Sequence, residues 1–339
     1  MEFREYVPLA PYTTFKIGGP ARWFAEAISE AEILEAVEFA RERDVPLFAL
    51  GGGSNLLVAD EGFPGLVLRI GLKGIEQDGD RFDVGAGEDW DGFVAHAVEG
   101  NYAGVECLAG IPGTAGGTPI QNVGAYGQEV SETVTQVRTL NLSTLKFQVY
   151  SNADCGFAYR QSVFNTSRRG KYIVTRVTYR LRENGPPQIA YADLKRRFQN
   201  FAAPSLRDVS EAVREIRRGK GMYIVPGDAD CRSAGSFFKN PVVSAEHFAR
   251  IAKGEPNEVP HYPAANQAVK IPAAWLLEQA GFHRGYAMGA AGISSRHTLA
   301  LINRGDAKAV DIFALRDRIV AQVESRFGIL LEPEPVLLA

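Results

Sequence analysis

Residues 47–58 read LFALGGGSNLLV, so three successive glycines separate two short apolar runs. Glycine inside a strand or helix costs roughly 0.5–1 kcal/mol relative to alanine, because it loses more conformational freedom on folding. A compensating role is therefore expected at Gly51, Gly52 and Gly53. Successive backbone N–H groups can approach an anion closely at glycines, which favours phosphate binding. A tight turn between two buried strands explains the same residues.

This glycine run matches neither of the two common nucleotide-binding loops. A P-loop requires the pattern G-x-x-x-x-G-K-[ST], which is absent, and the dinucleotide fingerprint requires a third spaced glycine where this chain has Leu56. The following residues, LLVADEGFPG, do not begin a helix as both motifs require. If the run binds phosphate, it does so in another fold.

The composition is that of an ordinary globular protein. The chain has 339 residues, of which 45% are hydrophobic and 23% charged, and about 100–200 residues per domain predicts two or three domains. A net charge of −3 gives no global attraction for nucleic acid. Cys107, Cys155 and Cys231 form no C-x-x-C pair, so neither a disulfide framework nor a metal site is predicted. The N-terminus lacks the apolar segment of a signal peptide and no run of ~18 apolar residues occurs, so the expected location is the cytoplasm.

Local patterns predict helices and strands throughout the chain. Ser29 is followed three residues later by Glu32 and then by apolar residues at helical spacing, which predicts a helix that 44–46 ends. Further helices are predicted at 89–99, from Ser205 or Asp208 onward, and at 273–279. Strands are predicted at 47–50, 56–58, 66–68, 82–84, 137–142, 147–150 and 172–181.

The last predicted helix runs from Asp306, its expected N-cap, to Phe327, with Gly328 as the residue that ends it. Its inward face is predicted to consist of Val310, Phe313, Val320, Val323 and Phe327. A charged, proline-bearing stretch around residue 200 predicts a domain boundary there.

A second glycine-rich segment, GIPGTAGGTPIQNVGAYG at 110–127, contains six glycines and no charged residue. A flexible linker would normally be more polar. The segment therefore indicates backbone packed closely around something flat or anionic, although a compact loop beneath a neighbouring domain has the same composition. Together the two glycine-rich loops suggest an extended cofactor, with a diphosphate at one loop and a ring system along the other.

Two further motifs contain polar residues in apolar surroundings. Arg160 lies in CGFAYRQSVF (155–164) and requires an anionic partner, either a ligand or an internal carboxylate, because an unpaired buried charge is costly. Ser236 lies in AGSFFKNP (234–241), which is not a G-x-S-x-G elbow and has no recognisable His–Asp pair. Ser236 is therefore not predicted as a nucleophile, and a role as proton or hydrogen-bond donor remains.

The segment GILLEPEPVLLA carries Glu332 and Glu334 two residues apart, on one face if the segment is extended. Pro333 and Pro335 cannot donate to a ladder, so the segment is predicted to be an edge or irregular strand. Charges that protect an exposed edge would explain the two glutamates without any role in chemistry.

Taken in order, six segments resemble the UDP-N-acetylenolpyruvoylglucosamine reductase family in its type I form. These are TTFKIGG (13–19), LGGGSNLLV (50–58), GIPGTAGGTPIQNVGAYG (110–127), FAYRQSVF (157–164), GSFFKNP (235–241) and LEPE (331–334). The resemblance spans nearly the whole chain. It implies a flavoenzyme of bacterial peptidoglycan precursor synthesis, and so a part in cell-wall biogenesis, cell shape and cell division.

The resemblance also implies a fold. An α+β FAD-binding fold of the vanillyl-alcohol-oxidase (PCMH) type is expected, with two FAD-binding subdomains at 1–70 and 71–204. An α/β substrate-binding domain is expected at 205–339, whose last strand could return to the FAD site. In such a family the LGGGSN loop holds the FAD diphosphate and the second segment runs along the cofactor. The cofactor-binding residues that it implies are Gly51, Gly52, Gly53, Ser54, Asn55, Gly113, Thr114, Gly117, Gln121, Asn122, Gly124, Ala125 and Tyr126.

The chemistry implied is hydride transfer from NADPH, through FAD, to the vinyl carbon of UDP-N-acetylglucosamine enolpyruvate, which yields UDP-N-acetylmuramate. Arg160 would hold the substrate carboxylate and the developing enolate charge. Ser236 would donate the proton to C2, and Glu334 would lie at the enolate end of the site. The substrate-binding residues implied are Tyr191, Lys220, Asn240 and His297, although simple packing would also explain His297.

Two departures from the family pattern affect these assignments. Pro335 replaces a valine directly after Glu334, and 220–233 differs in length from some relatives, which bears on Lys220. The basic run that ends at Lys220 is expected to be a mostly solvated helix face with one functional member.

Two alternatives remain open on the sequence, namely another FAD-dependent oxidoreductase or oxidase of the same fold, and a binding protein without turnover. In each case the expected partners are small molecules, with no metal, nucleic acid or membrane, and the chain is expected to be a monomer.

Overall fold

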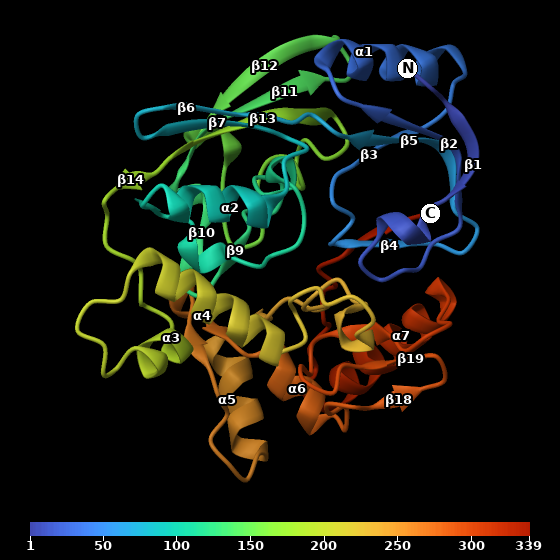
Figure 1. The fold of residues 1–339 in the computed structure, drawn as a ribbon. Coiled ribbons are helices and arrows are strands. Elements are labelled where there is room, and N and C mark those ends of the chain that lie inside the picture. Colours follow the sequence, from blue (N-terminus) through green and yellow to red (C-terminus); the bar gives the residue numbers. More distant parts are fainter. The chain divides into compact units, whose positions relative to one another are not determined.

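The computed structural model describes residues Met1–Ala339, and these form two compact units that are drawn in Figure 1. Unit 1 comprises Met1–Pro8, Pro20–Gly53 and Phe63–Gly219. Unit 2 comprises Leu9–Gly19, Ser54–Gly62 and Lys220–Ala339. The boundary in the glycine run therefore falls between its last glycine and the serine that follows, and each unit contains part of the predicted loop.

The first sheet of unit 1 contains the predicted strand that leads into the glycine run. Its strand order is β1-β2-β5-β3, and β5 pairs in parallel with both neighbours. The strands are β1 (Arg4–Pro8), β2 (Pro20–Ala27), β3 (Leu47–Leu50) and β5 (Phe63–Ile70). Helix α1 (Glu30–Glu42) packs on this sheet, and Ser29 accepts a hydrogen bond from Glu32 N, as the capping pattern predicts. The glycine run thus begins at the carboxyl end of a parallel strand.

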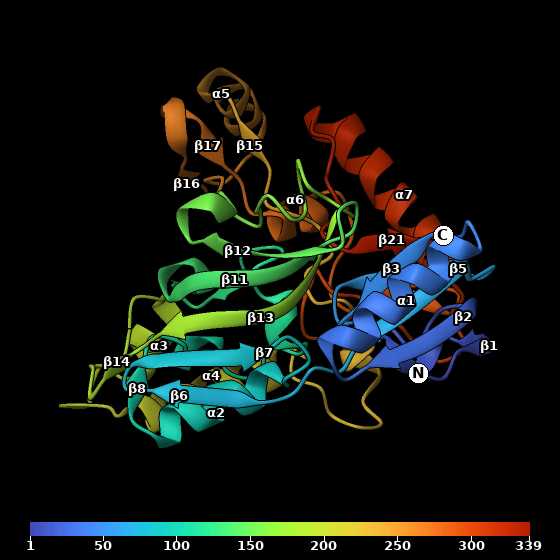
Figure 2. The same ribbon diagram turned by 90° about the horizontal axis from the view of Figure 1, so that it is seen from above.

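The second sheet of unit 1 has the order β12-β11-β13-β7-β6 and is antiparallel throughout, as Figure 2 shows from above. Its strands are β6 (Ile75–Asp78), β7 (Arg81–Gly85), β11 (Val134–Asn141), β12 (Lys146–Ser151) and β13 (Tyr172–Arg180). Helix α2 (Trp90–Glu99) has Asp89 as its N-cap, which accepts from Gly92 N. The predicted strands at 82–84, 137–142, 147–150 and 172–181 are confirmed to within a few residues.

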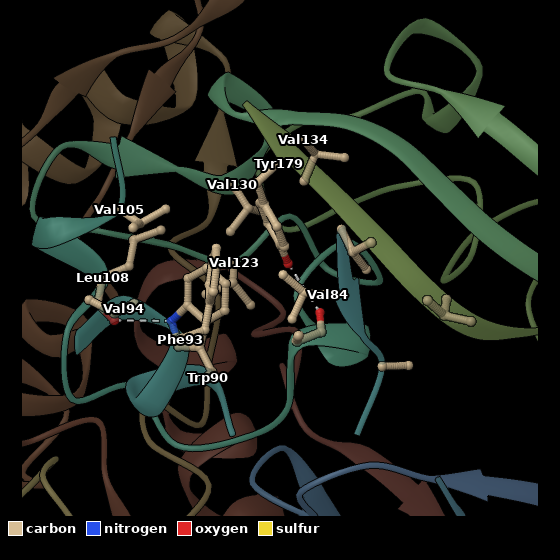
Figure 3. Packing of buried hydrophobic residues seen from close by; sticks show 14 of the residues in the cluster. Val84, Trp90, Phe93, Val94, Val105, Leu108, Val123, Val130, Val134 and Tyr179 are labelled. Carbon is tan, nitrogen blue, oxygen red and sulfur yellow. Dashed lines mark hydrogen bonds between the residues drawn. The ribbon is translucent and has the colours of Figure 1, made fainter. Parts of the chain in front are cut away.

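An aromatic core joins this sheet to the second glycine-rich segment. Figure 3 shows Trp90 and Phe93 of α2 packed against Tyr179 of β13, with ring centroids 5.7 and 4.9 Å from the tyrosine. Trp90 Nε1 donates to Leu108 O at 3.1 Å, and the Tyr179 hydroxyl lies 2.7 Å from Thr118 Oγ1. Because buried Tyr and Trp side chains find hydrogen-bond partners, Tyr179 of β13 holds Thr118 in the middle of the segment, and Trp90 of α2 holds Leu108, two residues before it.

Shorter elements complete unit 1. They are β8 (Tyr102–Ala103), η2 (Glu106–Leu108), η3 (Ala115–Gly117), β9 (Gly124–Ala125), β10 (Gln128–Glu129), η4 (Val130–Glu132), η5 (Ala153–Cys155), β14 (Arg182–Glu183), α3 (Ala192–Arg197) and α4 (Leu206–Gly219). Of the two predicted starts of α4, Ser205 is the cap, because Ser205 Oγ accepts from Asp208 N at 3.1 Å. By its contacts α4 belongs to unit 1, although the sequence assigns it to the start of the third domain.

Unit 2 has a helical core beside short strands. Its elements are η1 (Ala10–Tyr12), β4 (Leu56–Val58), η6 (Ala229–Cys231), β15 (Val242–Val243), α5 (Ala245–Gly254), β16 (Tyr262–Pro263), η7 (Ala265–Gln267), β17 (Val269–Lys270), α6 (Ala273–Gln279), β18 (Ala287–Met288), β19 (Ala291–Ile293), β20 (Leu301–Asn303), α7 (Ala309–Phe327) and β21 (Val336–Leu338). Strand β21 pairs in parallel with β4, and α7 packs on β19 and β20. None of the helices in either unit combines the length and hydrophobicity that crossing a bilayer requires.

The start of α7 corrects the sequence prediction. The helix begins at Ala309, and its N-terminal amides are capped by a distant carboxylate, because Asp60 accepts from Ala309 N at 2.8 Å and from Val310 N at 3.0 Å. Asp306 is therefore not the N-cap. The predicted inward face is wrong at Val310, which is 58% exposed; the buried residues are Ala309, Ile312, Leu315, Ile319, Val323 and Phe327. Gly328 ends the helix in the left-handed conformation as predicted.

Candidate functional site

The two glycine-rich loops lie directly against each other in unit 1. A Cβ atom built on Gly52 would lie 2.6 Å from Gly113 Cα, and one on Gly51 would lie 2.9 Å from Thr114 Oγ1. Real Cβ atoms do not approach other atoms so closely, so any side chain at Gly52 would push backbone against backbone. The fold therefore joins two segments that the sequence could only predict separately.

The amides of this joined loop pair are suited to bind an anion. The N–H groups of Gly51, Gly52 and Gly53 donate no hydrogen bond within the protein. Gly53 has a φ of 62°, in the left-handed region. Successive N–H groups that turn through such a conformation form a concave anion-binding surface. The donor set thus fits the diphosphate of FAD, and no side chain lies at these three positions to obstruct it.

Arg160 occupies a tight turn with strained backbone. Tyr159 and Arg160 are its central residues, and reciprocal bonds of 3.0 Å between Ala158 and Gln161 close it. Arg160 has a φ of 56°, which costs a non-glycine residue roughly 1–2 kcal/mol. Its Nη1 donates to Gly124 O in the second glycine-rich segment at 2.9 Å. Strain of this kind persists only where surrounding contacts enforce it.

Those contacts come from alternate residues of the second segment. Ser162 Oγ donates to Ile120 O at 2.6 Å, and Asn122 Nδ2 donates to Ala158 O at 3.1 Å. Asn122, which is 1% exposed, also donates to Glu129 Oε2 at 2.8 Å and accepts from Ser131 N at 3.1 Å. The side chain of this predicted cofactor residue is thus used within the protein and holds the Arg160 turn.

Tyr191 lies beside the end of the second segment. It directly precedes α3 and is 42% exposed. Its ring meets that of Tyr126 edge to face, with centroids 5.3 Å apart. The structure therefore brings together a predicted cofactor residue and a predicted substrate residue within unit 1.

Helix α4 supports the beginning of the second segment, which corrects the prediction of a mostly solvated basic face. Arg217 is 6% exposed and its Nε donates to Gly110 O at 2.9 Å. Arg214 pairs with Asp91 at 2.7 Å, and the same carboxylate accepts from Gly110 N. Burial lowers the pKa of the Arg217 guanidinium, while Tyr126 and Asp91 act in the opposite direction. Arg217 follows Val209 and Val213 at helical spacing on the apolar stripe, and that spacing could have identified it.

In unit 2 the fold pairs the segment that contains Ser236 with the one that contains Glu334. Glu334 N donates to Phe237 O at 2.8 Å, and Lys239 N donates to Glu332 O at 3.0 Å. Phe237 is buried and so fixes the backbone next to the serine. The Ser236 hydroxyl makes no hydrogen bond within the protein. Two of the three predicted catalytic residues thereby lie on segments that an isolated antiparallel bridge between Phe238 and Pro333 joins.

Pro335 does not disturb this pairing. Asn55 bonds to the residues on both sides of Pro335: Asn55 Nδ2 donates to Glu334 O at 3.3 Å, and Asn55 O accepts from Val336 N at 2.9 Å. The proline, which has no N–H, thus lies at the one position between them that needs no donor. Glu332 forms an ion pair with Lys239, which distinguishes its role from that of Glu334.

The remaining predicted substrate residues belong to unit 2. Asn240 Oδ1 accepts from Ala273 N at the start of α6 at 2.8 Å. His297 Nδ1 accepts from Leu299 N at 3.0 Å, so the neutral imidazole carries its proton on Nε2. Lys220 directly follows α4, and a Cβ on the next residue, Gly221, would lie 3.2 Å from Arg296 Nε.

The loop that carries His297 is held by an ion-pair cluster. Arg296 pairs with Asp228, and its Nε donates to Asp230 Oδ2 at 2.9 Å. Ser295 donates to Asp230 at 2.6 Å. Although burial acts to raise it, hydrogen bonds from Ser295 and Arg296 hold the pKa of Asp230 below its usual value. The cluster keeps the histidine segment fixed to η6.

Two family models match most of the chain. One, described as an FAD binding domain, matches 21–144, and the other, described as UDP-N-acetylenolpyruvoylglucosamine reductase, C-terminal domain, matches 226–338. These matches and the mixed helix and sheet content confirm the predicted α+β FAD-binding fold.

Relatives match over nearly the full length. The UDP-N-acetylenolpyruvoylglucosamine reductase of Streptomyces coelicolor is 46% identical over 97% of this chain and 88% of its own. That of Thermobifida fusca is also 46% identical, over 99% of this chain and 98% of its own. Among solved structures, the UDP-N-acetylenolpyruvylglucosamine reductase of Thermus caldophilus is 27% identical, covers both chains completely and has a TM-score of 0.69.

Proposed function

The chain belongs to the UDP-N-acetylenolpyruvoylglucosamine reductase family, and we propose that Arg160, Ser236 and Glu334 carry the reaction of that family here. The reaction is the NADPH-dependent reduction of UDP-N-acetylglucosamine enolpyruvate to UDP-N-acetylmuramate with bound FAD, in peptidoglycan precursor synthesis. The observation that supports this assignment most strongly is that the second glycine-rich segment holds the Arg160 turn at Ile120, Asn122 and Gly124.

The residues that would hold FAD belong to the joined glycine loops and their continuation. The amides of Gly51, Gly52 and Gly53 would bind the diphosphate, and Gly113 allows the close approach of the two loops. When bound, FAD supplies hydride transfer from NADPH to the enolpyruvyl group. The protein's contribution is to orient the substrate, stabilise charge and supply a proton.

Arg160 would stabilise negative charge on the substrate carboxylate and on the enolate that develops during the reaction. Preorganised donors aimed at developing charge are usually the largest contribution to catalysis. The strained turn and the bond from Nη1 to Gly124 O hold the guanidinium in place before substrate binds. Little reorganisation would then be needed as charge develops.

Ser236 would donate the proton that C2 of the substrate receives. Serine is a poor acid in water, so the transfer requires a basic enolate within hydrogen-bond reach. Its hydroxyl has no internal partner, and Glu334 lies on the segment that is bridged to its own. Among the substrate-binding residues, Lys220 would contribute charge for the diphosphate, and the Asn240 Nδ2 and His297 Nε2 groups would donate hydrogen bonds.

An anaerobic absorbance titration tests this function. We expect purified protein to be yellow, to bleach when NADPH is added, and to recover its colour only when the enolpyruvyl sugar nucleotide follows. Recovery with oxygen alone, and not with the sugar nucleotide, would favour an oxidase of the same fold. A colourless protein that cannot be reconstituted with FAD would refute the role of both glycine loops.

A substitution at Asn122 tests whether this side chain holds the Arg160 turn. Asn122→Asp keeps the acceptor for Ser131 N but places a carboxylate oxygen against Glu129 Oε2 and Ala158 O. Because two donated bonds are lost and two carboxylates are brought together, we expect colour recovery with the sugar nucleotide to slow by about 10- to 100-fold. The affinity for FAD should change by less than about threefold, since the side chain is not expected to contact the cofactor.

The matched control at this position is Asn122→Gly, which tolerates the φ of 45° but lacks the side chain. It should slow colour recovery less than Asn122→Asp, because it introduces no repulsion. If a variant binds FAD more weakly but keeps its rate of colour recovery per bound FAD, Asn122 does not hold the Arg160 turn. Its side chain would then be assigned to cofactor binding.

We further propose that the chain acts as a monomer in the cytoplasm on small molecules alone, and that its domains are 1–70, 71–204 and 205–339, with α4 at the start of the third packed on η2 of unit 1. The strand order of the two sheets in unit 1 supports the first two of these domains. Sedimentation equilibrium would test the monomer.

A further inference from the structure

A buried carboxylate lies beneath the segment that leads to Tyr191. Glu106 is 0% exposed and accepts hydrogen bonds from Gly104 N at 2.7 Å, Gln128 Nε2 at 2.8 Å and Gln188 N at 2.8 Å. A buried charge is tolerated only when hydrogen bonds compensate for lost solvation, and these three donors do so. None of the functions assigned above uses this group.

Gln188 connects the hydrogen-bond network of Glu106 to the segment that leads to Tyr191. Besides its N–H bond to Glu106, its side-chain Nε2 donates to Gly127 O at 2.6 Å. Its carbonyl oxygen accepts from the Cys107 thiol at 3.1 Å. Three groups of one residue are thus fixed to η2 and to the end of the second glycine-rich segment. Residues 186–190 have no regular secondary structure of their own that could provide such order.

The same end of the second segment contacts Tyr191. Tyr126 meets the Tyr191 ring edge to face at 5.3 Å. A Cβ on Gly127 would lie 3.2 Å from Ala190 Cβ. Gln188 and Tyr191, which are three positions apart along the chain, therefore both lie against residues 126–127. With Gln188 fixed, residues 189–191 form a short tether whose length limits where the tyrosine ring can lie.

We infer that Gln188, supported by Glu106 and Gln128, is a positioning residue that holds Tyr191 for the sugar nucleotide. This inference rests on the proposed function of Tyr191 as a substrate-binding residue. The N–H, carbonyl and Nε2 groups of Gln188 are all bonded within the protein, so it acts on affinity for the sugar nucleotide. Bond formation and proton transfer at the substrate are unaffected by it.

The test compares Gln188→Ala with Gln77→Ala in the full chain. Gln77, at an exposed position of β6, donates a similar bond to Gly79 O at 3.1 Å, and it is the matched control. Loss of one side-chain bond should speed amide hydrogen exchange in 189–197 by up to about tenfold. In turnover, Gln188→Ala should raise KM for the enolpyruvyl sugar nucleotide by about fivefold while kcat changes by less than twofold. Gln77→Ala should change neither quantity.

Two results would overturn the inference. Exchange in 189–197 that equals wild type would show that Gln188 does not hold this segment. Faster exchange with an unchanged KM would show that the anchoring does not affect the substrate. The exchange measurement needs no turnover, so failure of the proposed function, seen as wild-type protein that does not recover colour with the sugar nucleotide, is distinguished from failure of the anchor.

Discussion

Replacement of Arg160 by alanine is expected to slow colour recovery with the enolpyruvyl sugar nucleotide by about 100- to 1,000-fold, the usual effect of removing one preorganised donor to a developing oxyanion. The guanidinium is fixed by the bond from Nη1 to Gly124 O and by the turn that Ala158 and Gln161 close. A small residue cannot replace its charge. Single-turnover absorbance measurements after bleaching with NADPH would report the rate.

Two controls separate the charge from the backbone in this experiment. Arg160→Gly relieves the strain of the φ of 56°, so a loss shared with Arg160→Ala must come from the missing guanidinium. Arg180→Ala removes an arginine whose side chain is 66% exposed and should leave the rate unchanged. If Arg160→Ala recovers colour as fast as wild type, Arg160 does not stabilise the enolate.

Replacement of Gly52 by valine is expected to yield protein that is purified without colour and binds FAD at least about 100-fold more weakly. Even the first added carbon would lie 2.6 Å from Gly113 Cα and 3.0 Å from Gly113 C, where no flexible side chain can move aside. The two loops must then separate, and the amides of Gly51 and Gly53 lose their common direction. Titration of apo-protein with FAD, followed by fluorescence, would measure the affinity.

Gly219→Ala is the matched control, because a Cβ there meets no atom within 4 Å. It should bind FAD as wild type does. Circular dichroism of Gly52→Val checks that unit 1 still folds. A folded, yellow Gly52→Val protein would show that the contact between the loops is not needed for cofactor binding.

The features that the sequence predicts correctly depend on residues close together in the chain. The start of α1 follows from Ser29 and Glu32, and the end of α7 follows from Gly328, because a cap needs only one helical turn. The two glycine-rich segments were each recognisable, but their contact at Gly52 and Gly113 was not. That contact joins residues that no local pattern relates.

The incorrect predictions also concern contacts between residues that are far apart in the sequence. Asp60 replaces Asp306 as the cap of α7 because a carboxylate distant in sequence reaches the first amides. Helical spacing places Arg217 on the buried face of α4, but its partner, Gly110 O, is distant in the sequence and periodicity does not reveal it. For Ser236 and Glu334 the resemblance supplied the roles, and their adjacency became visible only through the bond from Glu334 N to Phe237 O.

The division of unit 2 into three separate stretches of chain has a consequence for biosynthesis. Phe15, Ile17 and Leu57 lie in its hydrophobic core together with Phe237 and Phe238, yet the whole stretch 63–219 belongs to unit 1. A ribosome makes the chain from its N-terminus, and domains generally fold as they emerge. These early apolar side chains must therefore remain without their core partners until translation has passed residue 220. While most of unit 1 is being synthesised, the nascent chain thus exposes the apolar side chains of an incomplete second core. Chaperones that bind exposed apolar segments would encounter the chain in this state.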